Sequence, residues 1–262
     1  MEYQNNTESL EKYISEYVPD AARIGLVVAV EMSAVKRRYG YADEVFHHIG
    51  FTVYMYNLAR AFGDENRQGE LYVIKSGAGE INAASATQFL ISNYFVDVVL
   101  NFGVAGGLAE EVKVGDVFVV DQIVHHSFDC TELGPHFPAG KHVEYDSALI
   151  KTERTLFEIA LKAAGVPTCV CASGDRFIGM VESRRSLREQ FGADVAEMEA
   201  AGILMTADRN GVPSLFIKGV SDTVGTEADM VAEHFVEASD RCFDAMHKVI
   251  EAIYRYNIEV ME

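Results

Sequence analysis

Proline is scarce in this sequence, and no stretch resembles a linker between domains. The 262 residues include only five prolines and no run rich in serine, glycine or proline. Runs of that composition are typical of interdomain linkers. We therefore expect one domain over residues 23–262, preceded by a polar N-terminal extension over residues 1–22. A chain of this length can remove roughly three quarters of its surface from water on folding, so a self-sufficient core is expected.

Basic residues are also few. The sequence has 22 lysines and arginines against 40 aspartates and glutamates, which gives a net charge of −18. Such a charge repels phosphate backbones and anionic lipid headgroups, and the basic run at 36–38 is expected to be a solvated helix face. No stretch reaches the ~18 apolar residues that a membrane-spanning helix needs. Nucleic acid and membrane are therefore not expected as partners, and a small-molecule ligand is favoured.

The cysteines and histidines lack the spacing of metal sites. The four cysteines form no CxxC pair, and Cys169 and Cys171 are expected as buried thiols on one face of a strand. His125 and His126 would point to opposite sides of a strand. We therefore predict no metal and no cofactor, and His126 could face a pocket, a subunit interface or solvent. Reduced cysteines and an acidic N-terminus without an apolar run predict a cytoplasmic location.

Two glycine-rich segments follow apolar runs, and neither matches a nucleotide-binding loop. Gly77-Ala78-Gly79 lacks the third glycine of a dinucleotide-binding turn, and no GxxxxGK[ST] occurs in the chain. The second segment, 103–107, contains three glycines and two other small residues. Small residues let backbone N–H groups approach a ligand closely. Residues 103–107 are therefore a candidate binding segment, with a simple turn as the alternative.

Apolar runs alternate with segments of helical periodicity. The expected strands are 24–30, 54–59, 71–77, 96–103, 115–124, 168–174 and 214–222. The expected helices are 32–40, 81–95, 147–165, 195–211 and 232–256. This alternation predicts an α/β protein with a parallel or mixed sheet covered on both faces. Ligands of such proteins bind outside the carboxyl ends of the strands, so the residues that follow each apolar run are the candidates for a site.

Two carboxylates are expected at the same edge of the sheet. A helix from Met198 to Arg209 would rise ~18 Å, and a strand from Ser214 to Ser221 would return ~26 Å. Glu199 and Asp222 would then lie close together. Asp222, directly after an apolar strand, is a candidate general acid whose pKa burial could raise. The alternative for Glu199 is an ordinary acidic residue that complements the helix dipole.

Six segments together resemble one enzyme family. They are 77–83, 101–108, 114–116, 173–178, 195–199 and 220–222, or GAGEINA, NFGVAGGL, VGD, SGDRFI, VAEME and VSD. In order and spacing they are similar to the motifs of 5′-methylthioadenosine/S-adenosylhomocysteine nucleosidases, which belong to the nucleoside phosphorylase superfamily. The resemblance covers residues 24–255. It implies a three-layer α/β/α fold with a mixed, barrel-like central sheet, a homodimer, a role in methionine salvage and metal-free cleavage of an adenine N-glycosidic bond.

The resemblance also implies roles for individual residues. Asp222 would donate a proton to purine N7, with Ser221 orienting it. Glu199 would accept hydrogen bonds from the ribose hydroxyls, and this carboxylate would stabilise an oxocarbenium-like transition state. The remaining positions carried over as substrate-binding are Phe177, which would stack on the base, Ile178, whose backbone would read the base edge, Met198, which would pack under the sugar, and Glu197, Val104, Ala105, Gly106, Arg176 and Lys218.

Two positions depart from the family pattern. The family has a glutamate that polarises the attacking water where this chain has Ser33, and commonly an arginine where it has Lys218. Serine cannot act as a carboxylate base at pH 7. Glu31, two residues before Ser33, or Glu199 would then have to serve as the base. Otherwise the alignment slips by two residues, or the reaction is not ordinary hydrolysis.

Three alternatives remain open at this stage. A phosphorylase needs cations for phosphate, and Asn101 and Phe102 stand before Gly103 where an arginine would be expected, which leaves Arg176 as a substitute. A nucleosidase for another base or 5′ group, such as a futalosine-like substrate, is the second alternative. The third is a protein that binds a nucleoside without turnover.

Overall fold

The computed structural model describes residues 21–64, 67–223 and 228–259. The N-terminal extension therefore lies almost wholly outside the described residues, and the expected division of the chain at residue 22 stays a prediction. The first strand, β1 (Ala21–Val28), is a run of apolar and β-branched residues with parallel neighbours on both sides, β4 (Gln68–Lys75) and β5 (Val98–Gly107). Burial on both faces explains why its sequence is continuously apolar from Ile24 onward, after the exposed Arg23.

The central sheet closes on itself at one end. Strand β10 (Ser214–Asp222) pairs in parallel with β5 and antiparallel with β6 (Val117–His125). The ring continues from β6 through β8 (Thr168–Ser173) and β9 (Val195–Glu197) back to β5. Beyond β1 and β4 the sheet extends to β3 (Thr52–Asn57) and β2 (Glu44–His47). A further short strand, β7 (Leu149–Lys151), pairs antiparallel with β6.

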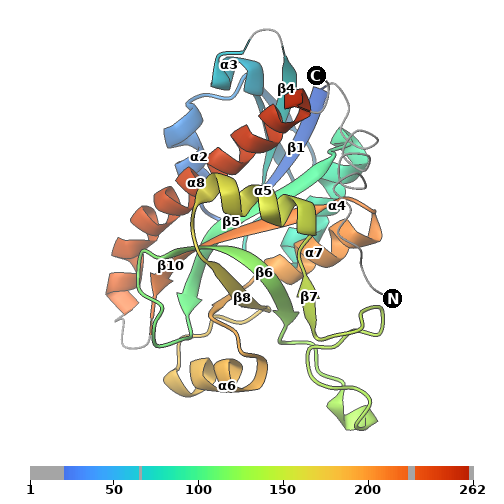
Figure 1. Cartoon of the computed structure of the whole chain (residues 1–262), viewed down its shortest axis with the longest axis vertical. Coiled ribbons are helices and arrows are strands. Elements are labelled where there is room, and N and C mark those ends of the chain that lie inside the picture. The colour runs from blue at the N-terminus through green and yellow to red at the C-terminus, as the bar shows by residue number, and fades with distance from the viewer. Residues whose placement is uncertain (1–20, 65–66, 224–227, 260–262) are drawn as a thin grey trace.

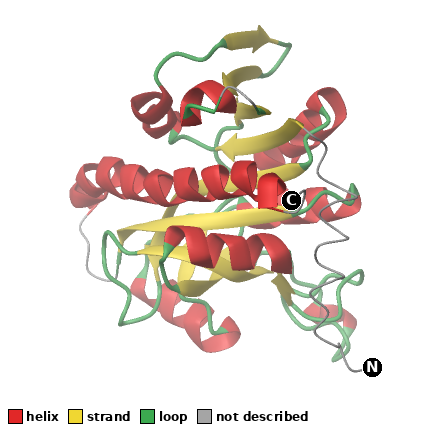
Figure 2. Cartoon of the chain, turned by 45° about the horizontal axis from the view of Figure 1, so that its top comes forward, coloured by secondary structure: helices red, strands yellow, loops and turns green. Residues whose placement is uncertain are grey.

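Helices cover both faces of this sheet. On one face, α8 (Ala228–Glu259), α5 (Arg154–Ala164) and α2 (Met32–Tyr39) pack on Leu26, Leu100 and Ile217. On the other face, α4 (Glu80–Tyr94) and α7 (Ala200–Arg209) pack on the alternate residues of the same strands. Figures 1 and 2 show the long α8 lying along the sheet, and α6 (Val181–Phe191) stands apart beside the barrel. The predicted three-layer α/β/α fold with a mixed, barrel-like sheet is confirmed.

Several expected elements have different bounds in the structure. The segment 147–165 was expected to be one helix, but Ile150 pairs with Ile123 in β7, and α5 begins only at Arg154. The carboxylate of Glu153 caps that helix by accepting hydrogen bonds from the backbone N–H groups of Thr155 (3.0 Å) and Leu156 (2.7 Å).

The segment 195–211 also divides. Its first three residues form β9, which completes the barrel, and α7 follows from Ala200. The expected strand 54–59 ends at Asn57, whose side chain caps the short helix α3 (Leu58–Phe62) by accepting from Arg60 N (2.9 Å). Helix α6 and strand β2 were not predicted, because their sequences are largely polar. Within the described residues, no helix combines the length and the apolarity needed to cross a membrane.

Candidate active site

The carboxyl ends of the barrel strands bring the two predicted carboxylates to one edge. In the sheet register, Asp222 on β10 pairs with Gly106 on β5, and Gly106 pairs with Ala196 on β9. Glu199 follows β9 directly, at the N-cap position of α7. Asp222 and the segment that carries Glu199 are therefore connected through two adjacent strand pairings. The side chains of Asp222 and Glu199 are both buried.

Asp222 has a donor on each of its carboxylate oxygens. Ser221 Oγ donates to Oδ1 at 2.8 Å, and the guanidinium Nη2 of Arg184 donates to Oδ2 in a short ion pair. Gly106 leaves the room for this pair, since a Cβ there would lie 3.2 Å from both Arg184 Nη1 and Asp222 Oδ2. Arg184 comes from α6 and is 3% exposed. Its polar surroundings in the sequence did not indicate a site residue.

Lys218 lies at the centre of a second buried group. It is 1% exposed, and its Nζ donates to Glu197 Oε2 and to Asn101 Oδ1, both at 2.7 Å. Burial disfavours the ammonium, but Glu197 and Glu199 outweigh that effect and raise the pKa of Lys218. Burial likewise opposes the charge of Glu197, but Lys218 holds the pKa of Glu197 below its usual range. Both members of the pair are therefore charged at neutral pH.

Glu197 also fixes the start of α7. Its carboxylate accepts hydrogen bonds from the backbone N–H groups of Glu199 (3.1 Å) and Ala200 (3.0 and 3.1 Å). These groups have no partner inside the helix. Glu197 therefore positions Glu199, rather than presenting a free carboxylate to a ligand.

Glu199 is a carboxylate that this environment makes hard to ionise. Burial and the nearby charge of Glu197 raise the pKa of Glu199 to about 7, against the opposing effects of Lys218 and a hydrogen bond from Gly79 N (2.9 Å). Gly79 adopts φ +100°, and a Cβ there would meet Asp175 Oδ1 at 2.8 Å, so glycine is needed at this turn. The glycine segment after β4 thus holds the candidate ribose-binding carboxylate.

Glu31 faces the same buried region. It stands at the N-cap of α2, and its Oε1 accepts from Val104 N at 3.2 Å while its Oε2 accepts from Val30 N at 2.9 Å. Helix α2 begins at Met32, and the side chain of Glu31 is buried against the glycine segment. Ser33, in the first turn of α2, is exposed.

The candidate base-binding loop, residues 174–180, lies between β8 and α6. Phe177 is 64% exposed, and Arg176 and Gly179 are exposed as well, whereas Ile178 is buried in a small apolar cluster with Leu108. Nearby strand ends leave Val104, Gly106 and Met198 half-buried and Ala105 buried. The loop therefore offers an uncovered aromatic ring, on which another ring can stack, beside an anchored backbone.

A family model described as the phosphorylase superfamily matches residues 23–255. The chain belongs to the phosphorylase superfamily. A 5′-methylthioadenosine/S-adenosylhomocysteine nucleosidase from Staphylococcus aureus (strain JH9) is 34% identical over 175 residues, which make up 64% of this chain and 75% of that relative. The resemblance seen in the sequence motifs is thereby confirmed.

Two solved structures of superfamily enzymes share the fold over most of their length. That of 5′-methylthioadenosine/S-adenosylhomocysteine nucleosidase from Neisseria meningitidis, in complex with methylthio-immucillin-A, is 27% identical with a TM-score of 0.77 and covers 88% of this chain and 99% of its own. Futalosine hydrolase of Helicobacter pylori strain 26695 is 25% identical with a TM-score of 0.78, covering 88% and 97%.

Three polar residues of this superfamily member were missed from the sequence. Arg184 and Asn101 are described above, and the third is Glu80, the first residue of α4. Ser173 Oγ donates to Glu80 Oε1 at 2.6 Å, and Gly202 N donates to Oε2. Burial and the charge of Glu197 raise the pKa of Glu80 to about 8. No spacing in the sequence distinguishes Arg184 and Glu80 from solvated residues, because their burial comes from packing between distant elements.

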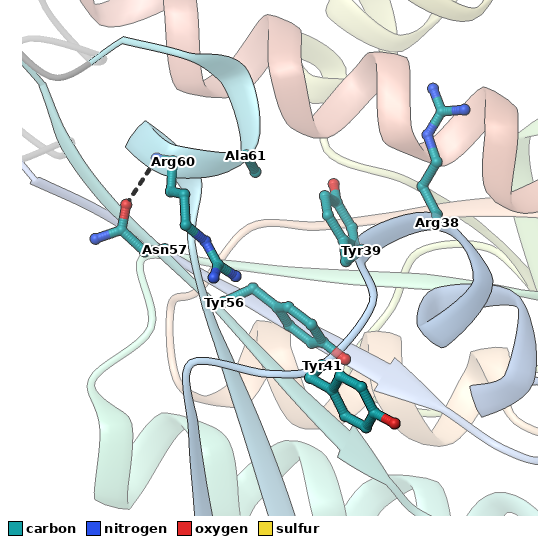
Figure 3. A pocket seen from close by; sticks show the side chains of 7 residues that line it. All are labelled: Arg38, Tyr39, Tyr41, Tyr56, Asn57, Arg60 and Ala61. Carbon is teal, nitrogen blue, oxygen red and sulfur yellow. Dashed lines mark hydrogen bonds between the residues drawn. The ribbon is translucent and has the colours of Figure 1, made fainter.

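A separate cavity of about 380 Å³ lies at the other end of α2 (Figure 3). Its walls are formed by Arg38, Tyr39, Tyr41, Tyr56, Asn57, Arg60 and Ala61. Arg60 is paired with Asp43 at 2.9 Å, and Arg38 lies 3.4 Å from Asp244. The cations of this cavity already have carboxylate partners, so we assign it no ligand.

The histidine and cysteine residues form no metal centre in the part of the chain that the structure describes, since no three His, Cys, Asp or Glu side chains there are grouped to hold an ion. All four cysteines are free, and Cys169 and Cys171 are buried. His126 is half-buried, and its Nε2 faces the backbone of Gly174, where a Cβ would lie 2.7 Å away.

Proposed function

We propose that this protein is a purine nucleosidase that hydrolyses the N-glycosidic bond of 5′-methylthioadenosine and S-adenosylhomocysteine type nucleosides and releases adenine. Membership of the superfamily and 34% identity to a nucleosidase of that name support the reaction class. The meeting of Asp222 and the Glu199 segment at one edge of the barrel supports the chemistry, because cleavage needs an acid at the base and a carboxylate at the sugar.

The proposed roles follow the direction of charge transfer. As the bond from C1′ to the base breaks, its electron pair moves to the purine, and Asp222 supplies a proton to N7. Positive charge develops on the ribose, where Glu199 stabilises it and accepts hydrogen bonds from the hydroxyls. Phe177 stacks on the base, the Ile178 backbone reads the base edge, and Met198 packs under the sugar.

Glu31 is our candidate for holding the nucleophilic water. Its carboxylate lies at the glycine segment 103–107, bonded to Val104 N, and its charge contributes to the raised pKa of Glu199. Ser33 is exposed on the first turn of α2 and is the weaker candidate. Water then adds to C1′, and Glu31 accepts the proton that the water loses.

The buried cations near the glycine segment already have carboxylate partners, which favours water over phosphate as the nucleophile. A phosphorylase must bind a dianion, and both buried cations that the structure describes at the glycine segment are already neutralised, Lys218 by Glu197 at 2.7 Å and Arg184 by Asp222. Glu31 and Glu199 add two further carboxylates to this region, which repel a phosphate. Arg176, the other candidate cation, is exposed on the base-binding loop with Ser183 Oγ at 3.5 Å from its guanidinium.

Base release in the presence and absence of phosphate tests the proposal. Purified protein is incubated with 5′-methylthioadenosine, S-adenosylhomocysteine, adenosine or futalosine, and the free base and sugar are measured by chromatography. We expect adenine and a free reducing sugar at equal rates with and without 10 mM phosphate. A sugar 1-phosphate would make the protein a phosphorylase, and binding without release would make it a nucleoside-binding protein. Release from futalosine alone would assign the second enzyme class represented among the similar structures.

The finer expectations from the family resemblance are proposals as well. We propose a homodimer in the cytoplasm that takes part in methionine salvage. The four free cysteines support a reducing compartment. Sedimentation velocity at micromolar concentration tests the dimer, and a species of 28.9 kDa alone would contradict it.

A further inference from the structure

Arg184 is the residue that the family motifs do not explain. It lies on α6, in a segment rich in arginine and glutamate whose sequence is typical of a solvated helix. Yet its guanidinium is buried, with Nη2 on Asp222 Oδ2 and Nη1 on the carbonyl oxygen of Gly107 at 2.8 Å. The two side chains are 4% and 3% exposed. Removing two charges from water is expensive, so a buried pair at a strand end requires an explanation.

The pair conflicts with the simplest form of the proposed mechanism. A group that donates a proton to the purine must first carry one, whereas a carboxylate that accepts from both Arg184 and Ser221 has both oxygens occupied by donors. Among the described residues, Arg184 is the charged group facing Asp222, because β5 presents only the backbone of Gly106 and Gly107. In the free protein Asp222 is therefore the carboxylate half of an ion pair.

We infer that Arg184 is a positioning residue that keeps Asp222 ionised in the free enzyme and stabilises the carboxylate that proton donation leaves behind. The inference rests on the proposed nucleosidase activity. Substrate binding brings a proton from solvent to Asp222, and the acid passes it to purine N7 as the C1′–N9 bond breaks. The base leaves neutral, water adds to C1′ and loses a proton to Glu31, and Asp222 returns to its ion pair.

Helix α6 links the Arg184–Asp222 pair to the candidate base-binding loop. The same short helix begins three residues after Ile178, at the end of the candidate base-binding loop. The orientation of Asp222 is thus fixed by the element that also anchors the loop. Arg184 Nε is buried without a hydrogen-bond partner among the residues that the structure describes, which leaves one donor of this guanidinium for a bound ligand or water.

The pH dependence of base release separates this role from simple structural support. We compare Arg184→Gln, which removes the charge, with Arg184→Lys, which keeps it. Arg188→Gln is the matched control on the same helix, because Arg188 forms ion pairs with Asp194 and Glu111 away from Asp222. Thermal unfolding of each variant checks that it is folded.

A neighbouring guanidinium moves the titration of a carboxyl by about one to three pH units. We therefore expect the alkaline fall of kcat/KM to move upward by about one unit or more in Arg184→Gln, with kcat lowered at least ~10-fold at pH 7 and KM changed less than ~3-fold. Arg184→Lys and Arg188→Gln should keep the wild-type pH of that fall. An unchanged profile in folded Arg184→Gln overturns the inference, whereas absence of base release from the wild type overturns the proposed function instead.

A second measurement needs no variant of Arg184. A 9-deazapurine nucleoside analogue carries a hydrogen on N7, so it binds best when Asp222 is already a carboxylate. Calorimetry in buffers of different ionisation enthalpy counts the protons released on binding. Equal proton release by wild type and Asp222→Asn supports the resting ion pair. One extra proton released by the wild type shows that Asp222 was protonated beforehand and overturns the inference.

Discussion

At the scale of single residues, the site holds carboxyl groups in contrasting environments. Glu199 lies close to other carboxylates, which together with burial raise its pKa to about 7, whereas Asp222 is paired with a guanidinium. Contrasting environments of this kind allow neighbouring acids to perform different tasks at one pH. The order of charges along the edge of the barrel is therefore part of the proposed mechanism.

Substitution of Asp222 by Asn should abolish base release and leave nucleoside binding nearly intact. The proton donor acts in the transition state, where general acid catalysis contributes about 10²- to 10⁴-fold. Turnover and calorimetric affinity for 5′-methylthioadenosine measure the two effects. Asp240→Asn, on the surface of α8 with Arg37 as its partner, serves as the control. Wild-type turnover in Asp222→Asn would remove this residue from the mechanism.

Glu199→Gln should lose the acid limb of the activity profile. Because the pKa of Glu199 is raised to about 7, the carboxylate form increases as pH rises through neutrality, and wild-type kcat, which reports the complex in which Asp222 already carries its proton, should increase with it. Glutamine cannot become charged, so the variant should lack this rise and lose about 2 kcal/mol of transition-state stabilisation. Initial rates from pH 5.5 to 8.5 give the comparison. The same rising limb in the variant would assign it to another group.

Glu31→Gln should reduce hydrolysis more than any change at Ser33. An oriented carboxylate that removes a proton from water contributes about 10²- to 10⁴-fold, and Glu31 is the buried candidate. Ser33→Glu restores the residue type of the family position and is expected to raise turnover only if its side chain can reach the site from the exposed face of α2. Steady-state kinetics of both variants provide the test. If neither substitution changes the rate of hydrolysis, the water is held elsewhere.

At the scale of elements, the sequence predicted the strands better than the helices. Largely apolar runs identified β1, β5 and β10, because burial on both faces leaves few polar positions in them, and the buried Asn101 and Lys218 are exceptions that pair with each other. The strand β7 was hidden inside a helical pattern, since its three residues gain their pairing only when β6 lies beside them. Such short strands are decided by tertiary contacts and not by local preference.

In the candidate site too, some residues could be predicted from the sequence and others could not. Asp222 could be located because it ends a recognisable strand, and Glu199 because the helix that it opens runs away from the site by about the length over which that strand returns. The burial of Arg184 and Glu80 could not, because an arginine or glutamate on a polar helix face is usually solvated. Glu31 was selected as a residue, but its direction depended on how the first turn of α2 meets the glycine segment 103–107.

Glu80 connects three elements, and its titration should be visible in stability. It begins α4, accepts from Gly202 on α7 and from Ser173 on β8, and its pKa is raised from 4.5 to about 8. A carboxyl group with a raised folded-state pKa stabilises the fold below the unfolded pKa and loses that contribution as pH rises through the folded pKa. The free energy of unfolding should therefore decline between pH 4.5 and 8.

Glu80→Gln should remove this decline, because an amide is neutral at every pH and its oxygen can still accept a hydrogen bond from Gly202 N. At pH 9 the variant is expected to be more stable than the wild type by at least about 1 kcal/mol. Urea unfolding at pH 5 and pH 9 measures the difference. Glu158→Gln, on the exposed face of α5, is the control. A variant that is less stable at both pH values would contradict the prediction.

At the scale of the whole molecule, the net charge of −18 should make stability depend on salt. Self-repulsion opposes the compact state, and salt screens it within a Debye length of about 10 Å at 0.1 M. Raising sodium chloride from 10 to 300 mM should increase the unfolding temperature by about 2–4 °C. Choline chloride should act equally if screening is the cause. A response to one cation alone would indicate specific binding.

The closed ring of five strands also constrains when the protein can fold during its synthesis. Strand β10 pairs with both β5 and β6, yet it leaves the ribosome about a hundred residues after them. Until then, both strands have an unpaired edge of exposed backbone groups, which favours pairing with other chains. Strand β10, which carries Asp222, is thus the last strand of the barrel to be synthesised. Its pairing completes the candidate catalytic edge and, in the same step, covers the strand edges that favour aggregation.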